Sequence, residues 1–313
     1  MKLKNTTISE DLERWIEAYL KHIQALSYSN NTFLLYRRIL LEFVEYSLDY
    51  QDEMQINDIK TTFLVNFLNY LENNSKNGNK LSKKTKITYL RVLTSFFSFI
   101  SDNNDDDLFV FSFDMKKIRF RTEKSEEKLN YLNENEIIRL NNVLEKEKAK
   151  KEVYNSFRNS LLIKLMLYGG LRIFEALNVK LCDFEEVDDE ILKISIIGKG
   201  GKEQFAFIKK EEVDDELEYF KENIQDSDYI MQTSTGKHLN RSNAFLIVNN
   251  IYTKALISKK GLHLLRHTLA MRLTAKGTNL VVIQKILRHA NLNTTTIYAK
   301  ATNDTVKAAL LNN

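Results

Sequence analysis

The C-terminal third of this sequence concentrates side chains that can bind phosphate and move protons. His263, Arg266 and His267 are spaced three and four residues apart, so on a helix they lie on one face. A second arginine–histidine pair, Arg288–His289, follows further along, and Tyr298 stands shortly after it. Imidazoles exchange protons near neutral pH, and guanidinium groups bind phosphate oxygens in pairs. These residue types indicate a site for a phosphate-bearing polyanion.

The charge pattern around these residues supports the same interpretation. Between Tyr229 and Asn303 the sequence contains no Asp or Glu but eleven Lys and Arg residues. A solvated basic face would account for such cations, but protein surfaces normally mix both signs. A long tract of one sign favours a polyanion such as the backbone of a nucleic acid. The net charge of the chain is only +4, so local clustering carries this argument.

The elements that must position these residues are mainly helices. The segment 263–275 and the apolar stripe at 280–287 are both typical of helices. Upstream, the apolar segment 161–168 ends at a glycine pair, and Arg172 and Glu175 follow; a structural ion pair between these two residues is a common alternative to a functional site. Residues 190–197, a glycine-rich turn and residues 203–208 predict a β-hairpin. We therefore expect a mainly α protein with a small antiparallel β-sheet.

The N-terminal part predicts a separate domain. Residues 1–105 contain four helical apolar stripes, and Ser9 and Ser82 are the expected N-caps of the first and fourth helices. Such a pattern indicates a compact helical bundle. The segment 106–130 has no clear helical period and is expected to be an extended linker. The chain is long enough for a second domain over residues 131–303.

The predicted fourth helix carries cations in an unusual place. Lys83, Lys84 and Lys86 crowd its first turn, where the helix dipole disfavours positive charge. Contact with phosphate would reverse that penalty, and Arg91 follows on the same helix. Exposed, solvated lysines explain the pattern about as well, so these residues alone do not decide between the two interpretations.

Taken together, these residues resemble the tyrosine recombinase, or phage integrase, family, including its Xer-type members. The family signature is His-x-x-Arg, then Gly-His, then a nucleophilic tyrosine, and here it is matched by His263, Arg266, His289 and Tyr298. Arg288 occupies the position of the usual glycine, and its effect on the turn before His289 stays open. The resemblance extends upstream to residues 170–175 and covers nearly the whole chain. It implies an N-terminal SAM-like core-binding domain and an α+β catalytic domain.

The resemblance assigns roles in phosphodiester cleavage. Tyr298 is the implied nucleophile, and Arg172 and Arg266 are implied to hold the non-bridging phosphate oxygens. Lys199 in the hairpin turn takes the position of the lysine that protonates the leaving 5′-oxygen. Lys202 is a near alternative, and the residue that is usually arginine after this turn is glutamine here.

The remaining site residues are histidines and their carboxylate neighbour. His263 is implied to accept or relay the proton of the tyrosine, and His289 to donate a hydrogen bond to the phosphate. Glu175 is expected to orient Arg172 or His267 without contacting the phosphate itself. His267 itself is expected to be structural.

The implied partners are double-stranded DNA and further copies of the chain. Contacts to DNA are expected from the N-terminal domain and from two cations of the catalytic domain: Lys83, Lys84, Lys86, Arg91, Lys202 and Arg241. The short apolar segment 304–313 is expected to dock on a neighbouring protomer, in a dimer on each DNA site and a tetramer in synapsis. One cysteine, five histidines and no carboxylate in the basic tract predict no metal centre, and no phosphate-binding loop motif for ATP occurs.

A site-specific recombinase with no cofactor is thus the function that the sequence favours, in chromosome partition or in integration of a mobile element. A non-catalytic DNA-binding protein of the same fold and a type IB topoisomerase-like relaxer stay open as alternatives. The sequence has no apolar run long enough for a membrane span, and its single Cys182 fits a reducing compartment. We therefore expect a cytoplasmic protein of bacterial type.

Overall fold

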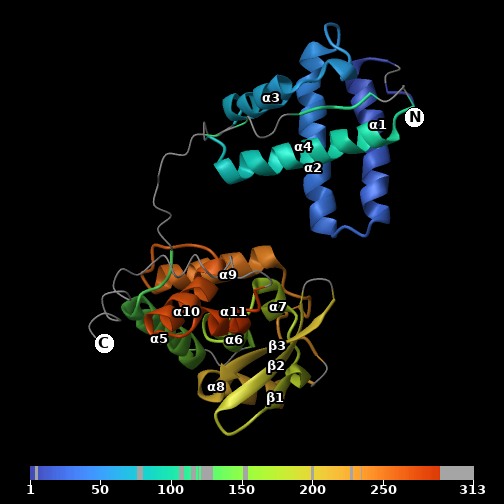
Figure 1. Cartoon of the computed structure of the whole chain (residues 1–313). Coiled ribbons are helices and arrows are strands. Elements are labelled where there is room, and N and C mark those ends of the chain that lie inside the picture. The colour runs from blue at the N-terminus through green and yellow to red at the C-terminus, as the bar shows by residue number, and fades with distance from the viewer. Residues whose placement is uncertain are drawn as a thin grey trace. The chain divides into compact units, whose positions relative to one another are not determined.

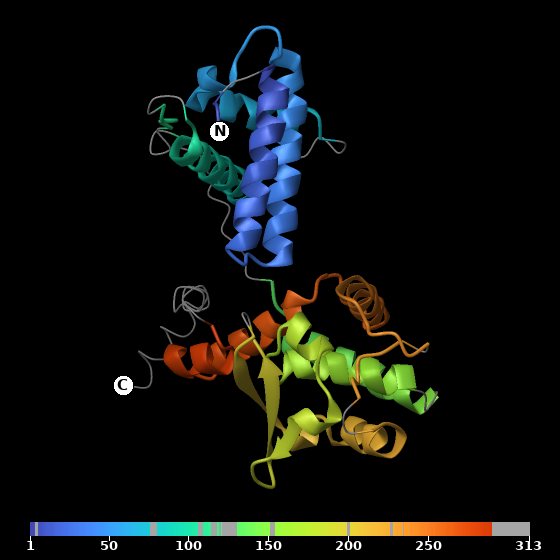
Figure 2. The same cartoon turned by 90° about the vertical axis from the view of Figure 1, so that its right-hand side faces the viewer.

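The computed structural model describes residues 1–3, 6–75, 80–105, 109–113, 118, 120, 130–150, 154–198, 201–225, 228–233 and 235–289. The expected site residues Lys199 and Tyr298, and the segment 304–313, lie outside the described residues. The chain divides into two compact units, Met1–Glu126 and Glu127–Asn313, each with its own hydrophobic core (Figures 1 and 2). None of the described helices is both long enough and apolar enough to span a lipid bilayer.

The described residues of the N-terminal unit form a bundle of four helices, as the sequence predicts. They are α1 (Ile8–Ala25), α2 (Asn30–Ser47), α3 (Thr61–Asn73) and α4 (Lys83–Asn103). Helices α1 and α2 form an antiparallel pair, and α4 crosses both (Figure 1). Short 3₁₀ turns over Leu48–Tyr50 and Ile56–Asp58 lead from α2 to α3.

Side-chain caps set where these helices begin, and one prediction was wrong. Helix α1 is capped by Thr7 rather than by Ser9, which lies buried in the first turn. The Thr7 hydroxyl accepts the Glu10 N–H at 3.4 Å, and the Glu10 carboxylate accepts the Thr7 N–H at 3.4 Å. This reciprocal pair satisfies two N–H groups at the helix start, which Ser9 cannot do because Leu12 stands three residues after it. Ser82 caps α4 as predicted.

Aromatic side chains fill the core of this unit. Phe43, Phe67 and Phe97 are fully buried, and the ring centroids of Phe43 and Phe67 lie 5.1 Å apart. Phe111 also packs there, with its ring 4.8 Å from that of Phe97, and its N–H donates to the Ser101 hydroxyl at 2.9 Å. Residues 109–113 form no helix or strand, as expected of a linker. Because Phe111 is anchored in this way, the segment packs on the bundle.

The C-terminal unit surrounds a buried helix with further helices and a small sheet. Its helices are α5 (Glu134–Lys150), α6 (Tyr154–Leu167), α7 (Ile173–Leu177), α8 (Asp214–Asn223), α9 (Arg241–Lys254), α10 (His263–Ala275) and α11 (Leu280–Ile286). Every residue from Leu161 to Leu167 is buried, and all of them except Lys164 are apolar, as expected of a helix in the centre of a core. Burial of this segment fixes the position of the end of α6. The turn that leads to Arg172, the first residue of the candidate site, follows directly.

The sheet contains the predicted hairpin and one further strand. Strands β1 (Phe184–Glu186), β2 (Ile191–Ile197) and β3 (Glu203–Lys209) pair antiparallel in the order β1-β2-β3. In the register, Ile194 lies opposite Ala206, and both are buried. The alternating burial of β2 places one face of the sheet against the core. The predicted fold class is confirmed; β1 is too short and too acidic to be seen in the sequence.

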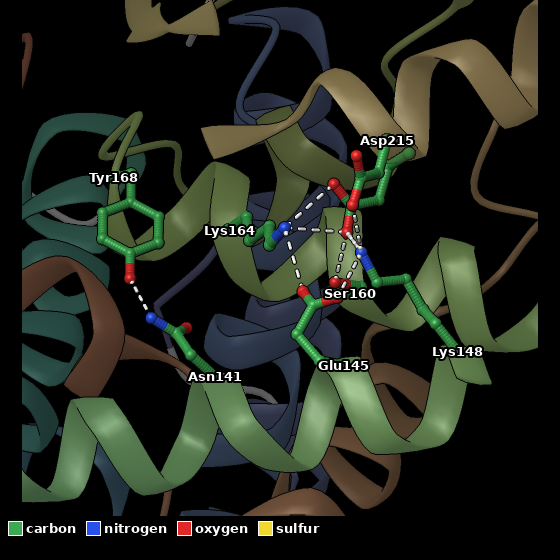
Figure 3. Close-up of polar contacts among 8 residues, drawn as sticks. Asn141, Glu145, Lys148, Ser160, Lys164, Tyr168 and Asp215 are labelled. Carbon is green, nitrogen blue, oxygen red and sulfur yellow. Dashed lines mark hydrogen bonds and ion pairs between the residues drawn. The ribbon is translucent and has the colours of Figure 1, made fainter. Parts of the chain in front are cut away.

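A buried ionic cluster joins three helices of this unit (Figure 3). Glu216 of α8 is fully buried and accepts hydrogen bonds from Lys148 of α5 at 2.9 Å and from Ser160 of α6 at 2.6 Å. Lys164 of α6 reaches the same carboxylate at 2.9 Å. Glu145, which is half exposed, adds a second negative charge beside both lysines. Mutual compensation is what makes so much buried charge tolerable.

We predict that Glu216→Ala destabilises the protein strongly. The substitution leaves two buried ammonium groups without their central partner, which should lower the free energy of unfolding by about 3–5 kcal/mol. Urea unfolding followed by circular dichroism measures this. Glu218→Ala is the matched control, because Glu218 lies on the same helix but is exposed, and it should change stability by less than about 0.5 kcal/mol. Equal effects of the two substitutions would contradict the prediction.

Candidate active site

The turn after α6 determines where Arg172 lies. Gly170 has a φ of +62°, and a Cβ atom there would stand 2.8 Å from the side chain of Leu269 and 3.2 Å from that of Leu287. Glycine thus permits both the left-handed turn and the close approach of α10 and α11. Arg172 directly precedes α7, and its N–H donates to the Glu175 carboxylate at 2.8 Å.

Helix α10 carries three of the predicted residues on its first turns. Arg266 is buried, and its guanidinium donates to the carbonyl oxygens of Gly170 and Leu287. It therefore ties α10 to the turn after α6 and to the end of α11. The rings of His263 and His267 have centroids 6.5 Å apart, as expected for residues four apart on a helix.

Glu175 lies between two guanidinium groups. Its Oε1 accepts Arg172 Nη1 at 2.7 Å, and its Oε2 accepts Arg288 Nη2 at 2.9 Å. Arg172 Nη2 also donates to the main-chain carbonyl of Arg288 at 2.8 Å. Burial would raise the pKa of Glu175, but the charges and hydrogen bonds of Arg288 and Arg172 outweigh it and hold the pKa below the usual value. Glu175 is therefore an anion that orients Arg172.

The three histidines beside these cations resist protonation. Burial lowers the pKa of His263, and Arg241, Arg266 and Arg172 lower it further. The pKa of His267 is lowered by burial, by His263 and by Arg266. Burial and then Arg266, Arg172, His267 and Arg288 bring the pKa of His289 to about 4. Neutral imidazoles can each accept one proton or donate one hydrogen bond, which suits proton transfer beside a phosphate.

The low pKa of His289 leads to a pH prediction. The unfolded chain takes this proton near pH 6.5, while the folded chain takes it only near pH 4, so the folded state should lose stability as the pH falls between about 6.5 and about 4. NMR titration of the His289 ring should give a midpoint near pH 4. His289→Gln should flatten part of the stability profile in this window, because glutamine does not titrate. A midpoint near 6.5 would show that the pocket does not exclude the imidazolium.

A cavity of about 310 Å³ opens beside the first turn of α10. His263 and His267 line it together with Arg241 from the start of α9 and Lys260 from the preceding loop. Arg241, predicted to contact DNA, thus stands close enough to His263 to depress its pKa. The two charged residues that line the cavity, Arg241 and Lys260, are both basic, so an anionic group is the ligand it favours.

The predicted DNA contacts of the N-terminal unit differ in their availability. Lys83 and Lys84 are exposed on the first turn of α4, and Lys83 and Arg91 line a cavity of about 600 Å³. Lys86 instead forms an ion pair with Glu72 at 2.8 Å and is only 18% exposed. Lys86 therefore stabilises the packing of α4 against α3, which weakens its assignment to DNA. In the C-terminal unit, Lys202 is exposed at the start of the returning strand.

The structure thus brings Arg172, Glu175, Arg266 and His289 together from three segments: the start of α7, helix α10 and the residues after α11. Sequence reasoning missed one participant, the side chain of Arg288. Its backbone keeps the left-handed conformation that glycine favours, with a φ of +51°. The position before His289 thus holds an arginine in a backbone conformation that glycine adopts more readily. The sequence did contain a sign of this role: an arginine in place of the family's glycine adds a long charged side chain next to the site.

Comparison with known proteins identifies the family of both parts of the chain. Residues 130–304 match the Phage integrase family, and residues 11–98 match the Phage integrase SAM-like domain. The tyrosine recombinase XerH of Campylobacter jejuni is 32% identical over 235 residues, which is 73% of this chain and 65% of that protein. The tyrosine recombinase XerC of Staphylococcus aureus is 27% identical over 95% of both chains.

Solved structures show the same fold. A XerH site-specific recombinase bound to a palindromic difH substrate, in a post-cleavage complex, superposes with a TM-score of 0.83 at 24% identity, covering 99% of this chain and 98% of that one. A pre-cleavage complex of XerH with difH superposes with a TM-score of 0.78 at 23% identity over 99% and 97% of the chains. From the matched domains and the assembled site, the chain belongs to the phage integrase family and is a tyrosine site-specific recombinase.

Proposed function

We propose that the chain cuts and rejoins double-stranded DNA at a specific site through a 3′-phosphotyrosyl intermediate on Tyr298. The observation that carries this proposal is the shared frame of Arg172 and Arg266, which meet through Glu175, Gly170 and the end of α11. Two guanidinium groups held on one frame suit the two non-bridging oxygens of a single phosphodiester. Relatives described in complex with a DNA substrate support the choice of DNA.

The proposed cleavage step conserves atoms and charge. The Tyr298 hydroxyl attacks the phosphorus, its proton passes to His263, and the new bond joins the tyrosine oxygen to the 3′-phosphate. The bond from phosphorus to the 5′-oxygen breaks, and Lys199, with Lys202 as the near alternative, supplies the proton to that oxygen. Arg172, Arg266 and a hydrogen bond from His289 stabilise the charge that develops on the phosphate.

Rejoining is the reverse of this step. The 5′-hydroxyl of another strand attacks the phosphotyrosine, and Tyr298 recovers its proton. Because the phosphotyrosyl linkage retains the energy of the broken bond, the exchange needs no nucleotide cofactor. In this proposal residues 1–105 and 131–303 bind the same duplex and are joined by the linker 106–130. Residues 304–313 dock on a neighbouring protomer, so that two dimers exchange strands as a tetramer in the cytoplasm, where the chromosome lies.

A nicked suicide substrate tests the proposal. Cleavage beside the nick releases a short 5′-hydroxyl fragment that diffuses away, so the covalent protein–DNA adduct accumulates. We expect a single adduct whose peptide map places the DNA on Tyr298. Capturing such adducts from genomic DNA then gives the target site. Specific binding without any adduct would favour a non-catalytic DNA-binding protein, and relaxation of supercoils by a monomer would favour a topoisomerase-like activity.

A further inference from the structure

Arg288 stands at a position that is unfavourable for any side chain. Its φ of +51° lies in the left-handed region, where a Cβ atom crowds the backbone and glycine is the relaxed choice. It directly follows the last turn of α11, and its N–H closes that turn on the Lys285 carbonyl at 3.0 Å. The side-chain contacts of an arginine at this position must offset the free-energy cost of its backbone conformation.

The Arg288 side chain is turned inward, with only 6% of its surface exposed. Nη1 donates to the Ile286 carbonyl at 2.9 Å, and Nη2 donates to the Gly170 carbonyl at 3.0 Å and to Glu175 Oε2 at 2.9 Å. Both terminal nitrogen atoms of this guanidinium are thus held by oxygen atoms of the protein. Arg288 therefore acts through the groups that it contacts.

Those groups are the supports of the two phosphate-binding arginines. The Gly170 carbonyl also accepts a hydrogen bond from Arg266, and the Glu175 carboxylate also accepts one from Arg172. The main-chain carbonyl of Arg288 holds Arg172 from the other side at 2.8 Å. The Arg172 side chain remains 38% exposed, so it can still meet a ligand. Arg288 thus contacts the group that holds the exposed Arg172 and the group that holds the buried Arg266.

We propose that Arg288 is a positioning residue for DNA cleavage: by occupying one oxygen of Glu175 and sharing the Gly170 carbonyl, it fixes Arg172 and Arg266 for the phosphate. Without it, the Glu175 carboxylate pairs with Arg172 alone, through the Arg172 N–H and guanidinium, and this neutral pair draws the side chain away from the ligand. With it, the Glu175 carboxylate lies between the guanidinium groups of Arg172 and Arg288. These three groups together keep a net positive charge. This inference rests on the proposed function and assigns a further residue to the same site.

The test compares single-turnover adduct formation by the full chain on the nicked substrate. Arg288→Gly removes the guanidinium and relaxes the backbone, so the fold is retained. We expect the cleavage rate to fall by about 10- to 100-fold, because small displacements of a positioned group cost this much, while affinity for uncut DNA changes by less than about twofold. Arg288→Lys should recover part of the rate. Lys285→Ala, which removes an exposed cation from the neighbouring helix α11, should leave the rate within about twofold.

Two further readouts separate positioning from mere structural support. In a Glu175→Gln background, the additional effect of Arg288→Gly should largely vanish, because the shared carboxylate is gone. On a scissile methylphosphonate, which lacks the negative charge that Arg172 neutralises, wild-type and Arg288→Gly rates should converge. A wild-type rate in Arg288→Gly, or a loss that is the same on both substrates and follows the melting temperature, overturns the inference. If the wild-type chain never forms an adduct, the proposed function fails and this inference with it.

Discussion

Tyr298→Phe should abolish covalent attachment to DNA while leaving DNA binding within about twofold of the wild type. The substitution removes one oxygen atom, the proposed nucleophile, and keeps the ring. Removing a catalytic nucleophile from an enzyme typically costs several orders of magnitude, so adduct formation should fall by at least about 10⁴-fold. Denaturing gels of the nicked-substrate reaction measure the adduct, and gel shifts with uncut duplex measure binding.

Tyr131→Phe is the matched control for this experiment. Tyr131 is exposed and lies before α5, and loss of its hydroxyl should leave both adduct and binding unchanged. An adduct that forms at the wild-type rate in Tyr298→Phe would assign the nucleophile to another residue. Loss of the adduct in both variants would point to a general loss of folding instead.

Arg266→Lys is expected to produce the second largest loss. The guanidinium of Arg266 donates to two carbonyl oxygens in different segments, Gly170 and Leu287, and an ammonium group lacks this planar fork. Cleavage should therefore slow by about 10²- to 10³-fold, as when one donor to a developing oxyanion is removed. Because a buried carbonyl is left without its donor, the free energy of unfolding should also fall by about 1–3 kcal/mol.

Single-turnover cleavage and urea unfolding separate these two effects. Arg272→Lys provides the control, because Arg272 lies on the same helix, is 28% exposed and pairs with Glu134 at 3.0 Å. That substitution should change neither cleavage nor stability appreciably. A fully active Arg266→Lys enzyme would show that a point charge suffices at this position and that the forked geometry has no role in cleavage.

Local patterns explain why much of the fold could be predicted. The hairpin over β2 and β3 follows from alternating apolar residues around a glycine-rich turn. The buried helix α6 follows from an apolar run that only Lys164 interrupts. Ser82 was recognisable as a cap because its position relative to the apolar stripe is local. Thr7 was missed because Ser9 satisfies the same rule when its partner three residues on is ignored.

Features that depend on distant segments could not be predicted in this way. The cluster at Glu216 draws on three helices, and no local rule pairs this carboxylate with Lys148 and Lys164. The direction of the Arg288 side chain depends on the approach of the turn after α6, more than one hundred residues earlier in the chain. The family motif named most of the site, but the depressed pKa of His289 required the packed positions of its neighbours. Lys199 and Tyr298 stay predictions.

The turn at Gly170 also bears on which sequences can carry this site. One backbone oxygen receives two arginines, while the missing side chain on the same residue lets Leu269 and Leu287 close over it. The spacing of these two arginines therefore depends on a glycine, which has no reactive group of its own. Any side chain at this position would meet both leucines in a strained backbone conformation, and we expect it to displace the shared carbonyl although every reactive side chain is still encoded.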